Sequence, residues 1–349
     1  FVTNTFNRNI NFLKSNHFRF FIIEKIPFSL HIKTIYYQLR SWYYFAKYKT
    51  TQNSFDINIS IDVKGFCQFL TLGNLQSSLL YYSLELQLMH DNDPDKILDY
   101  LKSYQSLERD QLSLISAVMI QSETRKKAFL SDYQLSNELP FFILPVTYDG
   151  DSIKEKKNYI REKYAIPTEK KIVLYMGGIH SYYKVKEIVL ELAKSSNCVL
   201  FLHGYYDSAY ISEIKNLVLK NKYSNIIFSD EIFSNIGDTN ILYQSADLGI
   251  AWYEYESLNF KTAAWSSGKI SGYLRFGLPV IINSGSGGRE VIAQKKCGVA
   301  IENTSEILVA IETILNSHGQ MASSCYLEFE NKYRFANYQN ELLGFIENL

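Results

Sequence analysis

The chain has few cysteines, no net charge and no long apolar run, and each absence excludes a class of protein. Its cysteines are scattered over 349 residues without a C-x-x-C pair, at Cys67, Cys198, Cys297 and Cys325. This spacing argues against a disulfide framework or a zinc site and fits a reducing compartment, so we expect a cytoplasmic protein. No apolar run reaches the ~18 residues of a membrane span. A P-loop and a nucleophile–histidine–acid arrangement are also missing from the sequence.

The balanced total charge hides one basic segment. Lys plus Arg and Asp plus Glu each number 36, yet residues 1–50 hold eight basic residues and a single acid, Glu24, among many aromatic side chains. Such a composition is typical of a surface that rests on anionic lipid, although a solvated helix with core aromatics is the alternative. We expect peripheral association with the inner membrane face. No binding motif accompanies the charge, so we expect no nucleic-acid partner.

The length predicts two domains, and alternating apolar runs and amphipathic stretches predict a parallel α/β architecture. A polar segment with Gly150, residues 148–156, is the expected linker. We expect strands at residues 18–23, 55–61, 79–84, 117–121 and 141–144 before it, and at 172–176, 199–202, 226–228, 248–251, 280–282 and 299–301 after it. Helices are expected at residues 35–49, 94–109, 123–130 and 326–349, and between the later strands.

The stretch 266–283, SSGKISGYLRFGLPVIIN, is the most informative part of the sequence. It predicts a polar turn, a helix, a Gly-Leu-Pro break and a buried strand. Ser266 and Ser267 are good N-cap residues, and Gly268 lets the backbone approach a ligand. Lys269 stands in the first helical turn, where the helix dipole ordinarily favours an acid. A bound anion would explain this lysine, and an exposed lysine on a routine αβ unit is the alternative.

This stretch resembles the nucleotide-sugar-binding helix and following strand of GT-B glycosyltransferases, especially glycosyltransferase family 4, which carry patterns like K-x-x-E-Y-L-A-x-G-x-P-V-I. Residues 171–193, 199–218, 225–256 and 285–301 follow the family's order of strands, loops and helices. The resemblance implies two Rossmann-like domains whose parallel sheets face an interdomain cleft. It implies an acceptor-side domain at residues 1–150, a donor domain at 151–325, and a last helix at 326–349 that returns to the first domain. The chain begins at Phe1 without the family's opening strand and Gly-rich turn, so we expect its first strand to be missing.

The resemblance also implies the activity and the site. It implies metal-independent transfer of a sugar, with retention, from a UDP- or GDP-linked donor to a hydroxyl of a glycan or lipid-linked acceptor, with no cofactor. Lys184 matches the family's diphosphate-binding lysine, whereas Gly178 stands where many members have an arginine, a charge that His180 or Lys269 would replace. The expected catalytic residues are Glu85, Lys184 and Lys269. The expected donor-binding residues are Gly177, Gly178, His180, Ser266, Ser267, Gly268, Gly287, Gly288 and Glu290.

Acidic residues are the main departure from the family. Its E-x7-E signature falls on Ala264 and Gly272, so Glu254 and Glu256 are candidate replacements, with exposed loop acids as the alternative. Asp62 and Glu85 are both expected to end strands and to point toward the cleft, where an acid could orient the acceptor hydroxyl or accept its proton; a helix N-cap or turn acid is the alternative for each. Residues 91–93 spell D-x-D, but they precede Pro94 and a helix, where such residues are common caps. We therefore predict no metal site. A catalytically inactive binding module and a nucleotide-sugar epimerase remain the alternative functions.

Overall fold

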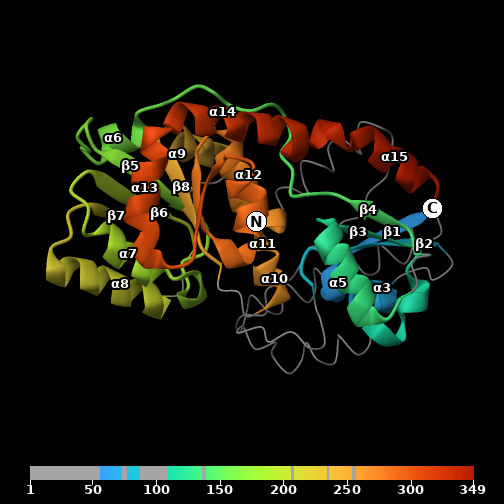
Figure 1. Ribbon diagram of the computed structural model, residues 1–349. Helices are drawn as coiled ribbons and strands as arrows, with labels where there is room; N and C mark the ends of the chain where they lie inside the picture. Colours follow the sequence, from blue (N-terminus) through green and yellow to red (C-terminus); the bar gives the residue numbers. More distant parts are fainter. Residues whose placement is uncertain are drawn as a thin grey trace. The chain divides into compact units, whose positions relative to one another are not determined.

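Two parallel β-sheets organise the computed structural model, which describes residues 56–72, 77–86, 108–135, 139–205, 208–233, 236–253 and 257–349 (Figure 1). The chain divides into two compact units. The first holds the described residues up to 144 together with 341–349, and the second holds 145–340. The strand expected at residues 18–23, the helix at 35–49 and most of the helix at 94–109 lie outside the described residues, as does the basic segment 1–50.

The first unit contains four parallel strands in the order β1-β2-β3-β4: β1 (Ile57–Ile61), β2 (Ser78–Tyr82), β3 (Ala117–Ile120) and β4 (Phe141–Ile143). Each was predicted to within two residues, because a short apolar run bounded by polar residues defines a buried parallel strand. Helix α3 (Asp62–Leu72) begins directly after β1 and was not predicted. Helix α5 (Glu123–Tyr133) follows β3, and Ser122 caps it by accepting a hydrogen bond from the Arg125 backbone N–H.

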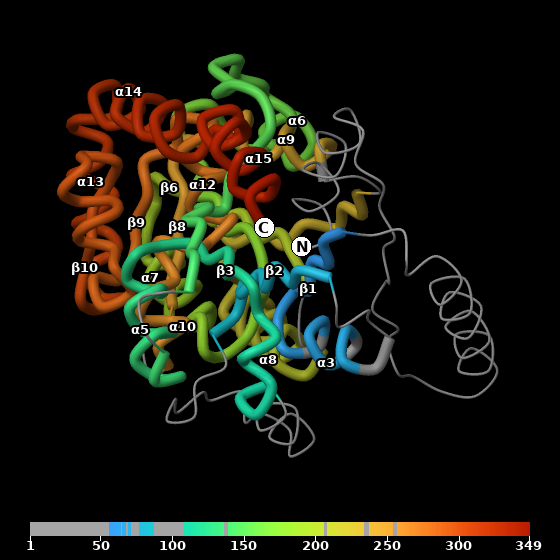
Figure 2. The backbone as a smooth tube through the Cα atoms, turned by 90° about the vertical axis from the view of Figure 1, so that its right-hand side faces the viewer, coloured from blue at the N-terminus to red at the C-terminus, as the bar shows by residue number. Residues whose placement is uncertain are grey.

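The end of the chain belongs to the first unit. Helix α15 (Gln339–Glu347) places the ring of Phe345 at 5.3 Å from that of Phe142 in β4. The Ser78 hydroxyl in β2 donates to the carbonyl of Leu349 at 2.6 Å. The tail therefore lies beside β2 and β4, as both views of the backbone show (Figures 1 and 2). The expected single helix over residues 326–349 was wrong in detail. Helix α14 (His318–Glu328) is separated from α15 by a π-helical turn and an extended residue, Arg334.

The second unit contains six parallel strands in the order β10-β9-β8-β5-β6-β7. They are β5 (Lys171–Met176), β6 (Cys198–His203), β7 (Ile226–Phe228), β8 (Leu248–Ala251), β9 (Val280–Asn283) and β10 (Gly298–Ile301). One face of the sheet packs on α7 (Val185–Leu192), α8 (Ser208–Asn221) and α13 (Ile307–Asn316). The other packs on α9 (Asn240–Gln244), α12 (Gly268–Arg275) and α14, with the short helices α6 (Tyr159–Lys163), α10 (Leu258–Lys261) and α11 (Ala263–Ser266) nearby. This unit is a three-layer sandwich, which buries both faces of a parallel sheet.

The expected linker, residues 148–156, is fastened to the second unit. The Arg275 guanidinium at the end of α12 donates to the carbonyls of Asp151 (3.1 Å) and Asp149 (2.9 Å) and lies 5.3 Å from the Tyr148 ring. The Lys156 ammonium donates to the carbonyls of Ala246, which follows α9, and Phe276, which follows α12. These partly buried bonds make the segment an ordered part of the second unit, although its polarity resembles that of a free linker.

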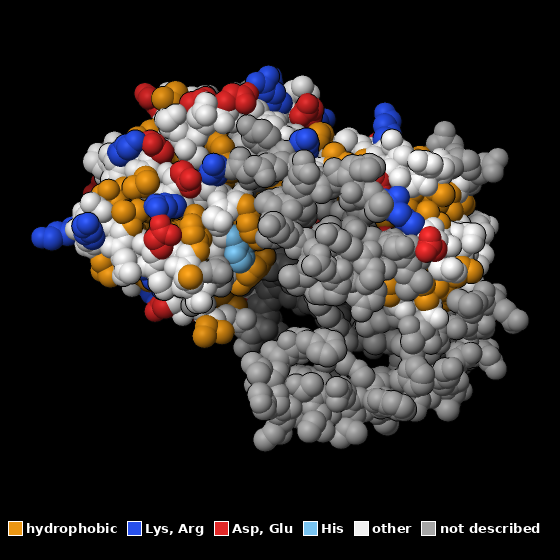
Figure 3. All heavy atoms as spheres, turned by 90° about the horizontal axis from the view of Figure 1, so that it is seen from below, with side chains coloured by type: hydrophobic (Ala, Val, Ile, Leu, Met, Phe, Trp, Pro, Cys, Tyr) orange, Lys and Arg blue, Asp and Glu red, His pale blue; other side chains and the backbone are white. Residues whose placement is uncertain are grey.

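No helix within the described part of the chain is long and apolar enough to cross a membrane. On the face shown in Figure 3, the coloured Lys and Arg side chains are interspersed with Asp and Glu side chains. The one strongly basic segment of the sequence, residues 1–50, lies outside the residues that the structure describes. The predicted membrane-binding surface therefore stays a prediction.

Candidate functional site

The order of strands in the second unit selects one place for a ligand. From β5 the chain builds outward through β6 and β7, then returns to add β8, β9 and β10 on the other side of β5. Ligands of open parallel sheets bind beyond the carboxyl ends of the strands at such a reversal. Here that point lies after Met176, where β5 ends, and after Ala251, where β8 ends. The predicted residues Gly177 and Gly178 follow β5 directly.

A buried tyrosine occupies the point where β5 and β8 part. These strands pair only at Val173↔Leu248 and Leu174↔Gly249. Beyond those pairs the Tyr273 hydroxyl of α12 accepts a hydrogen bond from the Met176 N–H at 3.0 Å. The same hydroxyl can donate to the Leu174 carbonyl, at 2.9 Å, or to the Ile250 carbonyl, at 3.0 Å. A Cβ at Gly249 would lie 2.6 Å from the Tyr273 ring. Tyr273 thus satisfies backbone groups that the diverging strands leave unpaired, and it anchors α12 at the reversal.

The start of α12 forms as the sequence predicts. The Ser267 hydroxyl caps the helix by accepting from the Lys269 N–H at 3.2 Å, and it also forms a hydrogen bond with the Tyr253 hydroxyl. The Ser266 hydroxyl bonds back to the Thr262 carbonyl at 3.4 Å and therefore serves the preceding turn. A Cβ added at Gly268 would meet only Val146, at 3.5 Å, so the backbone is open on that side.

Lys269 is half-buried as a residue, but its ammonium is buried and has no hydrogen-bond partner among the described residues. Its Nζ lies 4.3 Å from the ring centre of Tyr175, 4.9 Å from that of Tyr183 and 5.4 Å from that of Tyr253. We call these three rings the tyrosine cage. Aromatic faces attract a cation but replace only part of its lost hydration. Burial lowers the pKa of Lys269 from 10.5 to about 7.

Gly177 closes over the lysine. Its φ is +117°, and a Cβ there would lie 3.2 Å from the Lys269 Cε. A side chain at this position would be strained and would press on the lysine. The structure therefore brings together two of the predicted residues, Gly177 and Lys269, from segments almost a hundred positions apart. The cage that holds the lysine was not predicted.

The remaining predicted residues of the β5 loop surround the cage. The Gly178 carbonyl accepts from the Tyr175 hydroxyl at 2.6 Å. His180 stacks on Tyr182 with ring centres 5.2 Å apart and planes 7° from parallel. Lys184, next to the cage residue Tyr183, is half-buried with φ +50° and precedes α7. All of these residues lie at the carboxyl edge of β5.

The predicted Gly-rich turn has a packing explanation. Gly287 has φ +83°, and a Cβ there would lie 2.2 Å from the Trp265 ring. At Gly288 a Cβ would lie 2.6 Å from the Ile282 side chain. Glu290 is exposed in a single π-helical turn, Arg289–Ala293, where an ordinary helix was expected. Both glycines are therefore required by close approach to neighbouring side chains.

The positions of the family's two acids are closed by packing. Ala264 is buried, and a Cβ at Gly272 would lie 2.9 Å from the Tyr243 hydroxyl and 3.1 Å from that of Tyr148. Tyrosine side chains fill the space that a glutamate would need at Gly272. The candidate replacements, Glu254 and Glu256, lie outside the described residues.

Sequence reasoning missed Asn283, at the end of β9. Its amide donates to the Tyr253 carbonyl at 2.6 Å and accepts from the Tyr253 N–H at 2.9 Å, and its side chain is fully buried. These two bonds fix the chain after β8 and so place one wall of the tyrosine cage. An amide that ends an otherwise apolar strand, VIIN, is the signal that would have found it.

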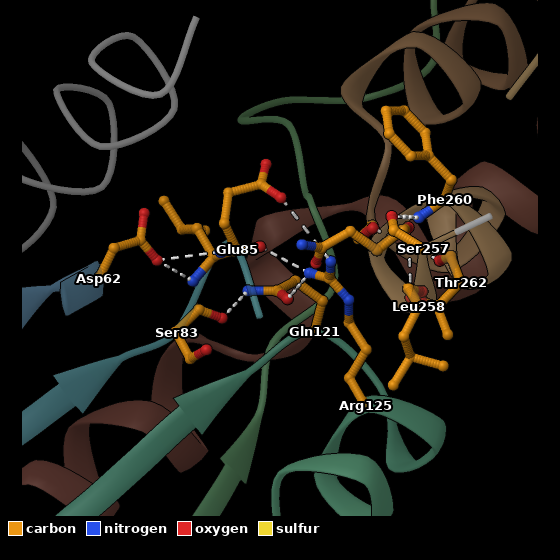
Figure 4. A network of polar contacts seen from close by, with 12 residues as sticks. Asp62, Ser83, Glu85, Gln121, Arg125, Ser257, Leu258, Phe260 and Thr262 are labelled. Atoms are coloured by element: carbon orange, nitrogen blue, oxygen red, sulfur yellow. Dashed lines mark hydrogen bonds and ion pairs between the residues drawn. The ribbon is translucent and has the colours of Figure 1, made fainter. Parts of the chain in front are cut away.

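In the first unit, two predicted acids lie just beyond neighbouring strands, Asp62 after β1 and Glu85 after β2 (Figure 4). Asp62 is the first residue of α3 and not the end of a strand; its Oδ1 accepts from the N–H groups of Leu84 (2.7 Å) and Glu85 (2.9 Å). Burial raises the pKa of Asp62 from 3.8 to about 7. Glu85 follows β2 with its side chain 61% exposed. Asp62 thus binds backbone, while the Glu85 carboxylate is available to solvent.

Among the described ranges, no group of three or more His, Cys, Asp or Glu side chains is arranged to hold a metal ion. Asp91 and Asp93 lie outside them. The expectation of a site without metal stays a prediction.

Comparison with known proteins identifies the fold. Residues 221–344 match the family described as "Glucosyltransferase 3-like, C-terminal domain". No curated protein sequence matches the chain. Its structure is similar to sucrose-phosphate synthase from Thermosynechococcus elongatus (14% identity, 92% of this chain and 80% of that chain, TM-score 0.67). It is also similar to HepE from Anabaena in complex with UDP (15% identity, 88% and 82%, TM-score 0.65) and with UDP-glucose (14% identity, 88% and 82%, TM-score 0.65).

These likenesses confirm the predicted GT-B fold, with its two parallel α/β units. The family match confirms the resemblance to glycosyltransferases over the C-terminal part of the chain. Fold and family match together bear out the prediction of a glycosyltransferase.

Proposed function

We propose that the chain transfers a sugar from a nucleotide-diphosphate donor to a hydroxyl of a glycan or lipid-linked acceptor, without metal or cofactor and with retention at the anomeric carbon. One observation carries this proposal: at the start of a helix, where the strand order of a parallel sheet reverses, the buried ammonium of Lys269 has no hydrogen-bond partner among the residues that the structure describes. A cation and the N-terminus of a helix both attract a diphosphate. The UDP and UDP-glucose complexes of HepE support a donor of this kind.

The proposed chemistry is mainly electrostatic. As the bond between the anomeric carbon and the diphosphate breaks, negative charge develops on the leaving phosphate oxygen. Lys269, Lys184 and the N-terminus of α12 stabilise that charge. The acceptor hydroxyl forms the new bond to carbon, and its proton passes to the departing phosphate oxygen. Glu85 is the candidate to orient the acceptor hydroxyl.

Donor binding should change the protonation of Lys269. A pKa of about 7 leaves most of this side chain neutral at pH 8, and a nearby diphosphate favours its charged form. We expect UDP binding at pH 8 to take up close to one proton, as measured by titration calorimetry in two buffers of different ionisation enthalpy. The Lys269→Met variant should show no such uptake. Proton-neutral binding by the unaltered chain would place the diphosphate away from Lys269.

Turnover separates the proposed function from its alternatives. A thermal-shift screen with UDP, GDP and ADP identifies the nucleotide, since a ligand that binds only the folded state raises its stability. The corresponding nucleotide sugars are then incubated with the chain. Release of the nucleoside diphosphate supports a transferase, and an isomerised sugar indicates an epimerase. Neither product, with binding intact, indicates an inactive binding module.

The lipid-linked acceptor and the peripheral membrane location rest on residues 1–50. Each basic residue near an anionic surface contributes about 1 kcal/mol, and less as salt rises. We expect the chain to co-sediment with anionic vesicles at low salt, to be released at high salt, and to ignore neutral vesicles. A chain that stays in the supernatant in every case would favour a soluble acceptor.

A further inference from the structure

The turn that carries Glu85 is held in an unusual way. In residues 83–85, five consecutive backbone groups are hydrogen-bonded, and four of these bonds go to side chains. The Ser83 N–H donates to the Met119 carbonyl at 3.0 Å, which is an ordinary contact with β3. Side chains from α3, from the end of β3 and from the first turn of α5 bind the other four groups, and the last two of these, Gln121 and Arg125, are buried.

Asp62 and Gln121 hold the turn from opposite sides. The single oxygen Oδ1 of Asp62 accepts from the N–H groups of both Leu84 and Glu85. From the neighbouring strand end, the Gln121 amide donates to the Ser83 carbonyl at 2.6 Å. Figure 4 shows these bonds converging on the chain just before and at Glu85.

Arg125 completes the arrangement. Its Nη1 donates to the Leu84 carbonyl at 2.5 Å and to the Gln121 side-chain oxygen, and its Nη2 lies 4.0 Å from the Glu85 carboxylate. The Arg125 side chain is 1% exposed, whereas that of Glu85 is 61% exposed. Arg125 therefore holds both the backbone and the outward carboxylate of one turn.

Holding a turn with buried charged side chains destabilises the fold, and a turn that serves only as a connection does not need it. Burying the Arg125 guanidinium removes it from water, and Asp62, which is half-buried, adopts φ +52°. A surface turn can satisfy its backbone with water at no such cost. Groups that act on a substrate need a fixed direction, and that need accounts for the buried polar residues.

We propose that Asp62, Gln121 and Arg125 are positioning residues that clamp the 83–85 turn and so direct the Glu85 carboxylate toward the acceptor hydroxyl. This inference rests on the proposed function for the reaction, but the clamp itself can be measured without turnover. It also gives Asp62 a role different from that of a cleft acid: it acts through its hydrogen-bond acceptor and not through its charge.

The test compares Asp62→Asn with Asp62→Gly. Both residues tolerate φ +52°, because Asn visits the left-handed region and Gly has no Cβ, but only Asn keeps an oxygen acceptor. We expect hydrogen exchange at the Leu84 and Glu85 amides to be at least roughly tenfold faster in the Gly variant than in the Asn variant. Equal exchange in the two variants, with both folded by circular dichroism, would overturn the clamp.

Measurements of turnover then test whether the clamp directs the Glu85 carboxylate. A catalytic group displaced by about 1 Å loses up to roughly a hundredfold in rate, so we expect kcat of Asp62→Gly to fall tenfold to a hundredfold while its KM for the donor stays unchanged. Asp62→Asn should retain most of kcat, whereas a cleft acid would lose activity in both variants. In a Glu85→Gln background, Asp62→Gly should cause no further loss, because it acts through Glu85.

The two proposals fail in different ways. An additive loss in the Glu85→Gln background would assign Asp62 a structural role and refute the positioning inference. If the unaltered chain turns over no nucleotide sugar, the proposed function fails, while the exchange experiment still decides whether the clamp exists.

Discussion

Replacing Lys269 with methionine should weaken donor binding and yet stabilise the fold. Methionine keeps a long unbranched side chain within the tyrosine cage but removes the charge. In the folded chain the ammonium is buried without a hydrogen-bond partner among the described residues. A functional group that the fold holds at a cost is expected at a binding site, where stability and activity oppose each other.

The magnitude follows from the pKa of Lys269. A fall from 10.5 to about 7 is roughly 3.5 pKa units, which at 1.36 kcal/mol per unit is about 5 kcal/mol against the charged form. The folded-state pKa is lowered, so the unfolded chain holds the extra proton between pH 7 and 10.5 and the stability of the unaltered chain rises with pH there. Lys269 therefore does not destabilise the fold above pH 10.5 and destabilises it by the full amount below pH 7.

The gain from methionine must therefore depend on pH. At pH 6 the fold loses the full amount of about 5 kcal/mol through Lys269. At pH 9, which is about 1.5 pH units below the unfolded-state pKa, it loses roughly 2 kcal/mol. We expect the gain in the free energy of unfolding to be about 3 kcal/mol larger at pH 6 than at pH 9.

Urea unfolding of both chains at pH 6 and pH 9 measures this difference. Lys220→Met, an exposed position in α8, is the matched control and should change stability by no more than about 0.5 kcal/mol at either pH. Calorimetry with UDP should show a loss of roughly tenfold to a hundredfold in affinity for Lys269→Met, as for a lost charge-assisted bond. A variant whose gain is independent of pH, or which is less stable at pH 6 than the unaltered chain, would refute the reasoning.

Four further outcomes are expected. Lys184→Ala should weaken UDP binding, and its effect should not add to that of Lys269→Ala if both contact one phosphate group; strict additivity in calorimetry would separate the two sites. Tyr273→Phe should lower the free energy of unfolding by roughly 1–3 kcal/mol, because the buried Met176 N–H loses its acceptor, and urea midpoints measure this. Gly249→Ala should cost about 1–3 kcal/mol in the same assay, since its Cβ would lie 2.6 Å from the Tyr273 ring; an unchanged midpoint would contradict that contact. Turnover should survive EDTA, and loss with rescue by Mg²⁺ or Mn²⁺ would show that the chemistry needs a metal.

The sequence by itself determined the local structure of both units. Apolar runs such as that of β8 end at polar or turn residues, and that pattern placed all ten described strands to within two residues of their bounds. Ser267 and Gly268 predicted the start of α12 because a cap is a contact between residues close in the chain. A helix directly after β1 was missed, because Asp62 begins α3 in a left-handed conformation and in contact with a distant turn.

Only the tertiary structure decided what the key charges meet. Lys269 was expected to face an anion, but its burial under Gly177 and among three tyrosine rings depends on the strand order, which brings the end of β5 beside the start of α12. Likewise, the role of Asp62 depends on a backbone turn more than twenty residues away. Spacing along the chain fixes periodicity and caps, because those contacts are local. The desolvation of a charge depends on every neighbour in space, so its pKa and its role are determined by the fold.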